Sequence, residues 1–155
     1  MESESDILRA LNPERTLPPP TESDFATAIE TLGYELPPPL KEIYGFCGGI
    51  VGPTDTWYLL PLIDGPDEET SLVSENLFWR PDGDAIPEWI DDFVCFGFGT
   101  DQCNLAVGRK SPYTVIRYYL PDSGEYEKTD GGIFDAIQTD KGEFDEMVRH
   151  EQPKP

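Results

Sequence analysis

The sequence has little of the chemistry that most enzymes and nucleic-acid-binding proteins need. It contains one histidine, His150, near the end of its 155 residues. Ser–His–Asp and Cys–His mechanisms require an imidazole that is held in place, which argues against a histidine-based nucleophile. The 11 Lys and Arg residues stand against 31 Asp and Glu, a net charge of −20. Such a chain repels a phosphate backbone and an anionic membrane, so we expect it to bind neither directly.

Cysteine and long apolar runs are scarce as well. The three cysteines, Cys47, Cys95 and Cys103, form no CxxC motif and have apolar neighbours. We therefore expect buried, reduced thiols rather than a zinc site shared with His150. No apolar run reaches the roughly 18 residues of a membrane helix. Residues 1–6 are acidic and polar, unlike the start of a secretory signal, so we expect a cytoplasmic protein.

Motifs for metals, nucleotides and paired-carboxylate catalysis are missing too. The acidic calcium loop with its later Glu does not occur, nor do the glycine-rich nucleotide loops. Asp91 and Asp92 are consecutive, and on a strand they would point to opposite faces. We predict no catalytic residue, no cofactor and no metal site. An enzyme with an unrecognised acidic site stays a third hypothesis, although 31 acids make chance carboxylate pairs common and nothing singles one pair out.

The composition suits one compact domain. Hydrophobic residues make up 37% of the chain and aromatic residues 12%, enough for one core at this length. We predict a partly ordered N-terminal segment over residues 1–20, a domain over residues 21–149 and a short tail over residues 150–155. Pro18-Pro19-Pro20 imposes an extended backbone at the end of the first segment.

Two helices are predicted at the start of the domain. Over residues 21–32, Thr21 is a good N-cap, apolar residues recur at helical spacing and Gly33 is the expected end. A second helix over residues 38–47 begins within a proline run, which a first helical turn tolerates. Gly48-Gly49 then ends it, since glycine allows a left-handed backbone and a direct reversal into a strand.

After Gly49 the apolar period changes from that of a helix to that of a strand. Candidate strands lie between turn signals, over residues 50–51, 57–62, 74–79, 93–97, 105–108 and 114–120. Short strands with brief loops favour a single antiparallel or mixed sheet. Residues 133–148 are predicted to form a closing helix. Helices, then strands, then a helix indicate an α+β domain.

Several stretches resemble the SUKH superfamily, which includes bacterial immunity proteins against polymorphic toxins and fungal cell-wall-assembly regulators. Residues 36–49, with Leu36-Pro37 before Tyr44 and Gly48-Gly49 at the end, are similar to the family's LP..L...Y...NGG pattern. Leu60-Pro61-Leu62 resembles the following strand end. Residues 93–107 are similar to the family's strand–loop–strand unit. The resemblance covers residues 20–140.

This resemblance implies a SUKH-like fold that presents a variable, non-catalytic surface to a protein partner. N-terminal helices would pack on the sheet and a C-terminal helix would close the domain. Gly48, Gly49 and Asn104 are then structural residues at turns. Asp101 can fix a turn by accepting backbone N–H bonds, and Asn104 can do likewise.

Charge indicates where such a partner would bind. Between Lys41 and Arg109 the chain has 13 acids and one base, Arg80, interleaved with Trp and Tyr residues. Interfaces favour aromatic anchors together with charges that steer and select. Trp79 is the preferred single anchor, beside a Pro-Asp-Gly turn. The predicted contact pool is Asp55, Trp57, Glu68, Glu69, Trp79, Asp82, Asp84, Asp91, Asp92 and Asp101.

The charge and the resemblance lead to one functional hypothesis and one alternative. A toxin that attacks nucleic acid must be basic where it holds phosphates, so an acidic inhibitor can occupy that groove. We hypothesise an immunity protein that neutralises a cognate, basic toxin domain through an acidic, Trp-containing face. The alternative is a regulatory or scaffold module, as among the cell-wall-linked members, that binds an endogenous protein.

Overall fold

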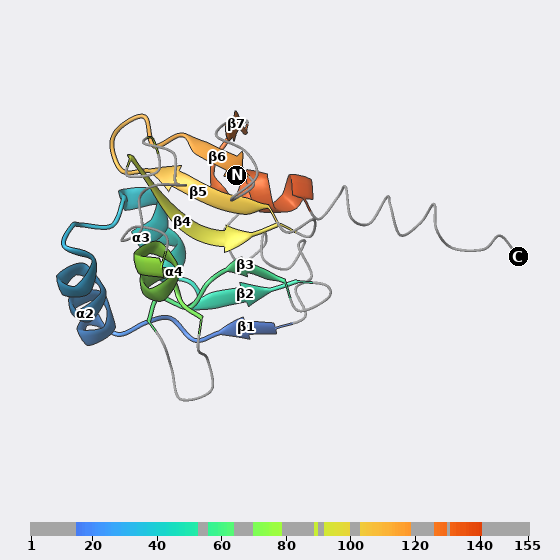
Figure 1. Cartoon of the computed structure of the whole chain (residues 1–155). Coiled ribbons are helices and arrows are strands. Elements are labelled where there is room, and N and C mark those ends of the chain that lie inside the picture. The colour runs from blue at the N-terminus through green and yellow to red at the C-terminus, as the bar shows by residue number, and fades with distance from the viewer. Residues whose placement is uncertain are drawn as a thin grey trace, which may run out of the picture.

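Helices and two antiparallel sheets make up the described part of the chain (Figure 1). The computed structural model describes residues 15–52, 56–63, 70–78, 89, 92–99, 103–118, 126–129 and 131–140. Helices and strands share one main core, which confirms the predicted α+β fold. The predicted division between domain and tail at residues 149–150 lies outside the described residues.

The strands divide between two sheets, where we predicted one. The first sheet has the order β1 (Arg15–Leu17), β2 (Gly49–Val51) and β3 (Trp57–Leu59). The second has the order β4 (Phe93–Phe98), β5 (Asn104–Gly108), β6 (Val115–Tyr118) and β7 (Tyr126–Lys128). The two sheets meet where the Leu60 N–H donates to the Phe96 carbonyl at 2.7 Å. The three-residue strands β1 and β7 have no counterpart in the prediction.

Helix α2 (Glu22–Leu32) confirms the predicted helix over residues 21–32. Thr21 caps it, because its Oγ1 accepts from the Asp24 N–H at 3.2 Å while Asp24 Oδ2 accepts from the Thr21 N–H at 2.9 Å. This reciprocal pair satisfies backbone N–H groups that a helix start leaves unpaired. Gly33 ends the helix with a φ of 85°, in the left-handed region that suits glycine.

Helix α3 (Pro38–Tyr44) begins in the proline run as predicted, but it ends at Gly45, before the predicted end at residue 47. It buries Leu40, Ile43 and Tyr44. The Tyr44 hydroxyl donates to the Leu60 carbonyl at 2.6 Å, so the helix is tied to the chain just after β3. This bond satisfies a hydroxyl that would be costly to bury alone.

The glycine pair after α3 serves a close approach rather than the left-handed turn that we expected. Neither Gly48 nor Gly49 has a positive φ. A Cβ atom at Gly48 would lie 3.2 Å from the Pro18 carbonyl carbon, and one at Gly49 would lie 3.1 Å from atoms of Leu17 and Trp57. The Gly48 N–H also donates to the Leu17 carbonyl at 2.8 Å. The pair therefore lets β2 lie directly against β1.

Helix α4 (Leu72–Phe78) shows that the predicted strand over residues 74–79 is wrong. The segment alternates apolar and polar residues in part, which suggested a strand. A buried serine, Ser71, instead caps a helix, since its Oγ accepts from the Ser74 N–H at 3.1 Å. Tertiary contacts then hold the helix in place, and the most specific of these involve Asn76.

Asn76 fastens α4 to the edge of β4. Its Nδ2 donates to the carbonyls of Cys95 at 2.8 Å and Leu72 at 2.7 Å, and its Oδ1 accepts from the Cys95 N–H at 3.0 Å. The amide thus bonds to both polar backbone groups of Cys95, as a neighbouring strand would. The register of β4 against β5 shifts between Cys95 and Gly97, as at a β-bulge.

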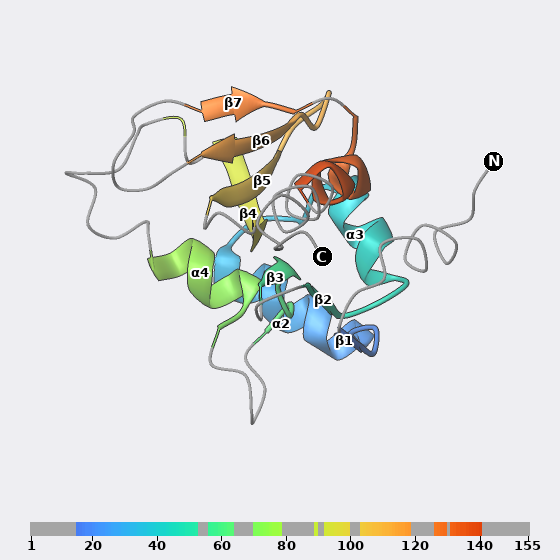
Figure 2. The ribbon, with the colours of Figure 1, turned by 90° about the vertical axis from the view of Figure 1, so that its right-hand side faces the viewer.

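In the second sheet β4, β5 and β6 are buried on both faces, and their side chains alternate between two clusters, whereas β7 is exposed. Val94, Phe96, Leu105, Val107 and Val115 enter the main core, whereas Phe93, Cys95, Ala106, Ile116 and Tyr118 form a smaller cluster on the other face. Residues 133–140 are helical, in agreement with the first half of the predicted closing helix. This helix and α3 lie on the same side of the second sheet and both contribute to the main core (Figure 2).

Candidate functional site

Most of the predicted contact residues lie outside the described part of the chain. These residues are Asp55, Glu68, Glu69, Trp79, Asp82, Asp84, Asp91 and Asp101. The structure describes the other two and places them apart. Asp92 lies just before the start of β4, whereas the backbone of Trp57 lies beside Gly97 near the other end of β4. A continuous acidic contact face stays a prediction.

Trp57 is a half-buried residue of β3 that packs against the main core. Its ring lies over Gly49 of β2, where an added Cβ would be 3.1 Å from the ring edge. Large aromatic side chains bury much apolar area in such positions. Trp57 therefore stabilises the first sheet, with only part of its surface left for a partner.

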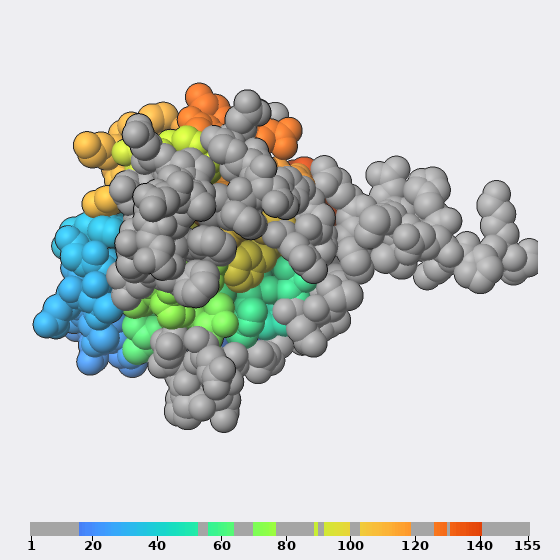
Figure 3. Space-filling view, in the orientation of Figure 1, coloured from blue at the N-terminus to red at the C-terminus, as the bar shows by residue number. Residues whose placement is uncertain are grey.

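The acidic surface that the structure does describe lies on α2 and α3, and only Glu42 of it belongs to the acidic stretch between Lys41 and Arg109. Residues 21–48 hold five acids and one base. That base, Lys41, pairs with Glu35 at 2.8 Å. Glu22, Glu30 and Glu42 are exposed, and α2 with the following residues forms the blue-to-cyan side of the molecule in Figure 3.

Phe46 gives this acidic side an exposed aromatic residue. The side chain is 43% exposed, and the helical hydrogen bonding continues past it, since the Cys47 N–H donates to the Ile43 carbonyl at 3.2 Å. Glu42 and Phe46 are therefore four residues apart on one helical face. An exposed ring beside carboxylates that pair with no described cation is a suitable contact for a basic protein surface.

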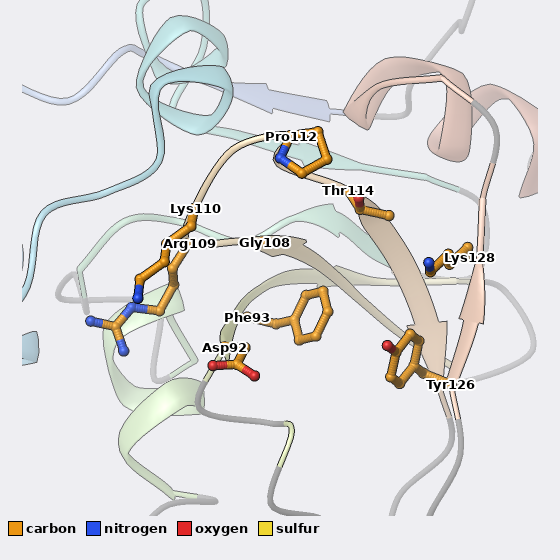
Figure 4. A pocket seen from close by; sticks show the side chains of 9 residues that line it. All are labelled: Asp92, Phe93, Gly108, Arg109, Lys110, Pro112, Thr114, Tyr126 and Lys128. Atoms are coloured by element: carbon orange, nitrogen blue, oxygen red, sulfur yellow. The ribbon is translucent and has the colours of Figure 1, made fainter.

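A pocket of opposite character lies at the end of the second sheet where the turn joins β5 to β6. It measures about 440 Å³ and is lined, among others, by Asp92, Phe93, Arg109, Lys110, Tyr126 and Lys128. We call it the basic pocket. As Figure 4 shows, Arg109 and Lys110 lie at one end and Lys128 at the other, with the Phe93 ring between them.

Aromatic rings support the basic pocket from behind. The Tyr126 ring centroid lies 4.7 Å from that of Trp89 and 5.4 Å from that of Phe93, and Trp89 also meets Tyr118 at 5.2 Å. Such tilted and edge-to-face pairs hold one another in place. Tyr126 is nevertheless 38% exposed, so part of its surface faces the pocket opening or solvent.

The basic pocket was not predicted from the sequence. Of the described residues that line it, only Asp92 belongs to the predicted contact residues. Arg109 and Lys110 stand in the turn between β5 and β6, and Lys128 ends β7. The antiparallel pairing of β6 with β7, with Ile116 opposite Lys128, brings the two lysine-bearing segments to the same end of the sheet. The adjacent Arg109-Lys110 pair in so acidic a chain was the available signal.

The three cysteines are free and buried, which confirms the prediction of buried thiols. Burial raises the pKa of the Cys95 thiol to about 12, and the charge of Glu75 adds to the effect. Burial also raises the pKa of the Tyr44 hydroxyl well above its ordinary value. Both groups are therefore neutral in the folded protein at ordinary pH, and neither resembles an activated nucleophile.

These raised pKa values predict that the fold loses stability in alkali. In the unfolded chain the Cys95 thiol ionises near its ordinary pKa of 9.0, but in the fold it holds its proton up to about pH 12. The unfolded state therefore binds fewer protons across this window, and the free energy of unfolding decreases as pH rises from about 9 to 12. Urea unfolding at a series of pH values measures this dependence. Cys95→Ala should flatten the slope, and an equal slope in both proteins would contradict the assignment.

Two further properties of the described residues bear on function. Within these ranges, no group of three or more His, Cys, Asp or Glu side chains could hold a metal ion. Nor does any helix there have the length and apolar character needed to cross a membrane.

Comparison with known proteins assigns the chain to a family. The SMI1 / KNR4 family (SUKH-1) matches residues 19–135. Comparisons with curated proteins and with solved structures found no match. The matched range runs from just before α2 into the helix of residues 133–140, so it includes both sheets apart from β1. The chain therefore belongs to the SMI1 / KNR4 family, a part of the SUKH superfamily that its sequence motifs resemble.

Proposed function

We propose that this chain is an immunity protein that neutralises a cognate toxin by masking a basic surface on it. Membership of the SUKH superfamily supports a role in binding a protein partner rather than in catalysis. The observation that carries the proposal is the large acidic excess, 31 acids against 11 bases. A toxin that cuts nucleic acid is the partner class that such a charge suits best, because it must present cations where it holds phosphates.

The described surface of α2 and α3 supports this proposal. Its single base, Lys41, is already paired with Glu35, so Glu22, Glu30 and Glu42 are available to steer a basic partner. Phe46 supplies an exposed ring at the same surface. The predicted residues Asp55, Glu68, Glu69, Trp79, Asp82, Asp84, Asp91, Asp92 and Asp101, together with the half-buried Trp57, stay in the proposal as further contacts.

Capture of the partner followed by a toxicity test examines the proposal. The tagged protein is expressed in its own organism, and retained proteins are washed at low and then high salt and identified by mass spectrometry. We expect one stoichiometric, basic protein that high salt loosens. Expression of the captured protein without this chain should arrest growth of the host cell, and co-expression of both proteins should restore growth. A harmless endogenous assembly protein would favour the regulatory or scaffold role instead, and no partner at either salt would contradict a stable acidic interface.

Substitutions then locate the interface. With the captured partner, Phe46→Ala should weaken binding by about tenfold or more, mainly by faster dissociation, if the ring is an anchor. Glu42→Lys should slow association at low salt, because it reverses a steering charge. Glu127→Lys makes the same charge change on the exposed strand β7 and is the matched control. Equal affinities for Phe46→Ala, Glu42→Lys and the control would exclude the surface of α2 and α3.

Trp79, the anchor chosen from the sequence, needs two measurements on one variant. For Trp79→Ala we expect a loss of about 2 kcal/mol or more of binding free energy if the ring contacts the partner. A buried ring would instead cost about 3–5 kcal/mol of folding stability. Affinity and thermal unfolding distinguish these results, and a folded variant with unchanged affinity would remove Trp79 from the interface.

A further inference from the structure

We propose that the basic pocket is a binding site for a small aromatic anion, a planar ring that carries a phosphate or a carboxylate group. The pocket lies between β4, the turn after β5 and strand β7. Its volume of about 440 Å³ falls within the range of small-molecule sites. This activity is separate from the proposed capture of a protein partner by the acidic surface.

Local charge is the first argument for an anionic ligand. Among the described residues that line the pocket, three are cations, Arg109, Lys110 and Lys128, and one is a carboxylate, Asp92, in a chain with almost three times as many acids as bases. Lys110 and Lys128 are exposed, and neither forms an ion pair with any residue that the structure describes. Two lysines at one pocket that pair with no described carboxylate are unexpected in so acidic a protein. They leave a local positive potential that an anion can satisfy.

Arg109 has a different part in the site. Its guanidinium carbon lies 3.8 Å from the centroid of the Tyr34 ring, which is a cation–π contact. This contact anchors one end of the pocket to the segment between α2 and α3. Arg109 therefore adds a fixed positive charge, while the two lysines supply donors that can move onto a ligand.

The aromatic wall is the second argument, and it specifies the rest of the ligand. Phe93 and Tyr126 line the pocket, and their rings are held at 5.4 Å from each other, with Trp89 packed behind Tyr126. A planar ring can stack on such a wall with little loss of side-chain entropy. Tyr126 and Lys128 are two residues apart on β7, so their side chains leave the strand on the same face. A ring on Tyr126 thus places an attached anionic group within reach of Lys128.

Asp92 limits which anions fit. Its side chain is exposed at the pocket, and its backbone carbonyl accepts from the Arg109 N–H at 2.9 Å, which fixes its position beside the cations. A carboxylate here disfavours a ligand with negative charge along its whole length. It favours a hydroxyl or amino group on the ligand, which can donate to it. The pocket therefore suits a compact anion with one charged end rather than a polyanion.

Calorimetric titration of the full chain tests the proposal with four probes. AMP carries a ring and a phosphate, and 4-hydroxyphenylacetate carries a ring and a carboxylate; adenosine and inorganic phosphate each lack one feature. We expect AMP or 4-hydroxyphenylacetate to bind with a Kd of about 1 mM or tighter, and at least about tenfold more tightly than adenosine and phosphate. The comparison of AMP with adenosine measures what the phosphate adds, and the comparison of AMP with inorganic phosphate measures what the nucleoside adds. Failure of both AMP and 4-hydroxyphenylacetate to bind, or equal binding of inorganic phosphate alone, would overturn the proposal.

Variants locate the binding and separate it from general charge effects. Lys128→Gln should weaken binding of the preferred probe by about tenfold, and Tyr126→Leu should weaken it by a similar factor. Lys41→Gln removes the same charge from α3 and is the matched control, so it should leave the affinity unchanged. A loss of affinity in Lys41→Gln equal to that in Lys128→Gln would show diffuse charge attraction and would contradict a site. Urea unfolding of each variant confirms that it is folded.

Discussion

Gly97→Ala is expected to lower the free energy of unfolding by about 3 kcal/mol, because alanine has no room where the two sheets meet. A Cβ atom at Gly97 would lie 2.6 Å from the carbonyl carbon of Tyr58 and 2.9 Å from the carbonyl oxygen of Trp57. These are backbone atoms of β3, so no flexible side chain can move aside. Separation of the strands would also weaken the bond from the Leu60 N–H to the Phe96 carbonyl.

Urea unfolding followed by circular dichroism measures this effect, with Gly108→Ala as the matched control. Gly108 ends the neighbouring strand β5, and a Cβ there would lie 3.4 Å or more from every neighbouring atom, at ordinary contact distance. We expect the control to lose less than about 1 kcal/mol. Equal stabilities of the two variants would show that β3 and β4 separate without cost.

Asn76→Ala is expected to cost a similar amount, about 3 kcal/mol, for a different reason. The substitution removes the amide that bonds to the buried N–H and carbonyl groups of Cys95 and to the Leu72 carbonyl. A buried backbone group that loses its partner costs about 1–3 kcal/mol. Alanine is a good helix former, so α4 itself loses nothing in intrinsic propensity. Urea unfolding again gives the change.

Asn104→Ala is the control for this prediction, since it makes the same substitution at another buried asparagine. Asn104 is 6% exposed and Asn76 is 3% exposed. Among the described residues the Asn104 amide donates only to the Cys95 sulfur, at 3.8 Å, a weak interaction. We expect a loss of about 1 kcal/mol there, and an equal loss at both sites would mean that burial alone decides the effect. Hydrogen exchange of the Cys95 amide, faster in Asn76→Ala, provides a second and independent measurement.

Elements with strong local signals could be predicted from the sequence, and those fixed by distant contacts could not. The helix of residues 22–32 has its cap at Thr21 and its stop at Gly33 within its own sequence, and both form as predicted. Helix α4 depends on Asn76 reaching Cys95, 19 residues away, and the prediction of a strand there was wrong. Strands β1 and β7 are three residues long, and pairing with β2 and β6 specifies them rather than any pattern of their own.

The candidate sites show the same limit. The excess of acidic residues was visible in the sequence, but the sequence does not show that Trp57 is half-buried against the main core. The basic pocket combines residues 92–93, 109–110 and 126–128, which approach one another only through the pairing of β4 to β7. Gly48 and Gly49 were recognised as structural residues, yet only the structure shows that they make room for β1.

The bond between Asn76 and Cys95 also bears on how the molecule avoids aggregation. β4 has the sequence Phe-Val-Cys-Phe-Gly-Phe, an uncharged apolar segment of the kind that assembles into stacked strands when its edge is open. In the fold, one edge of β4 is paired with β5, and Asn76 and Leu60 occupy hydrogen-bonding groups along the other. Local detachment of α4, which would also withdraw Leu72 and Val73 from the main core, would therefore expose a strand edge that other chains can join. Asn76 therefore covers an edge of β4 that would otherwise be open to pairing with other chains.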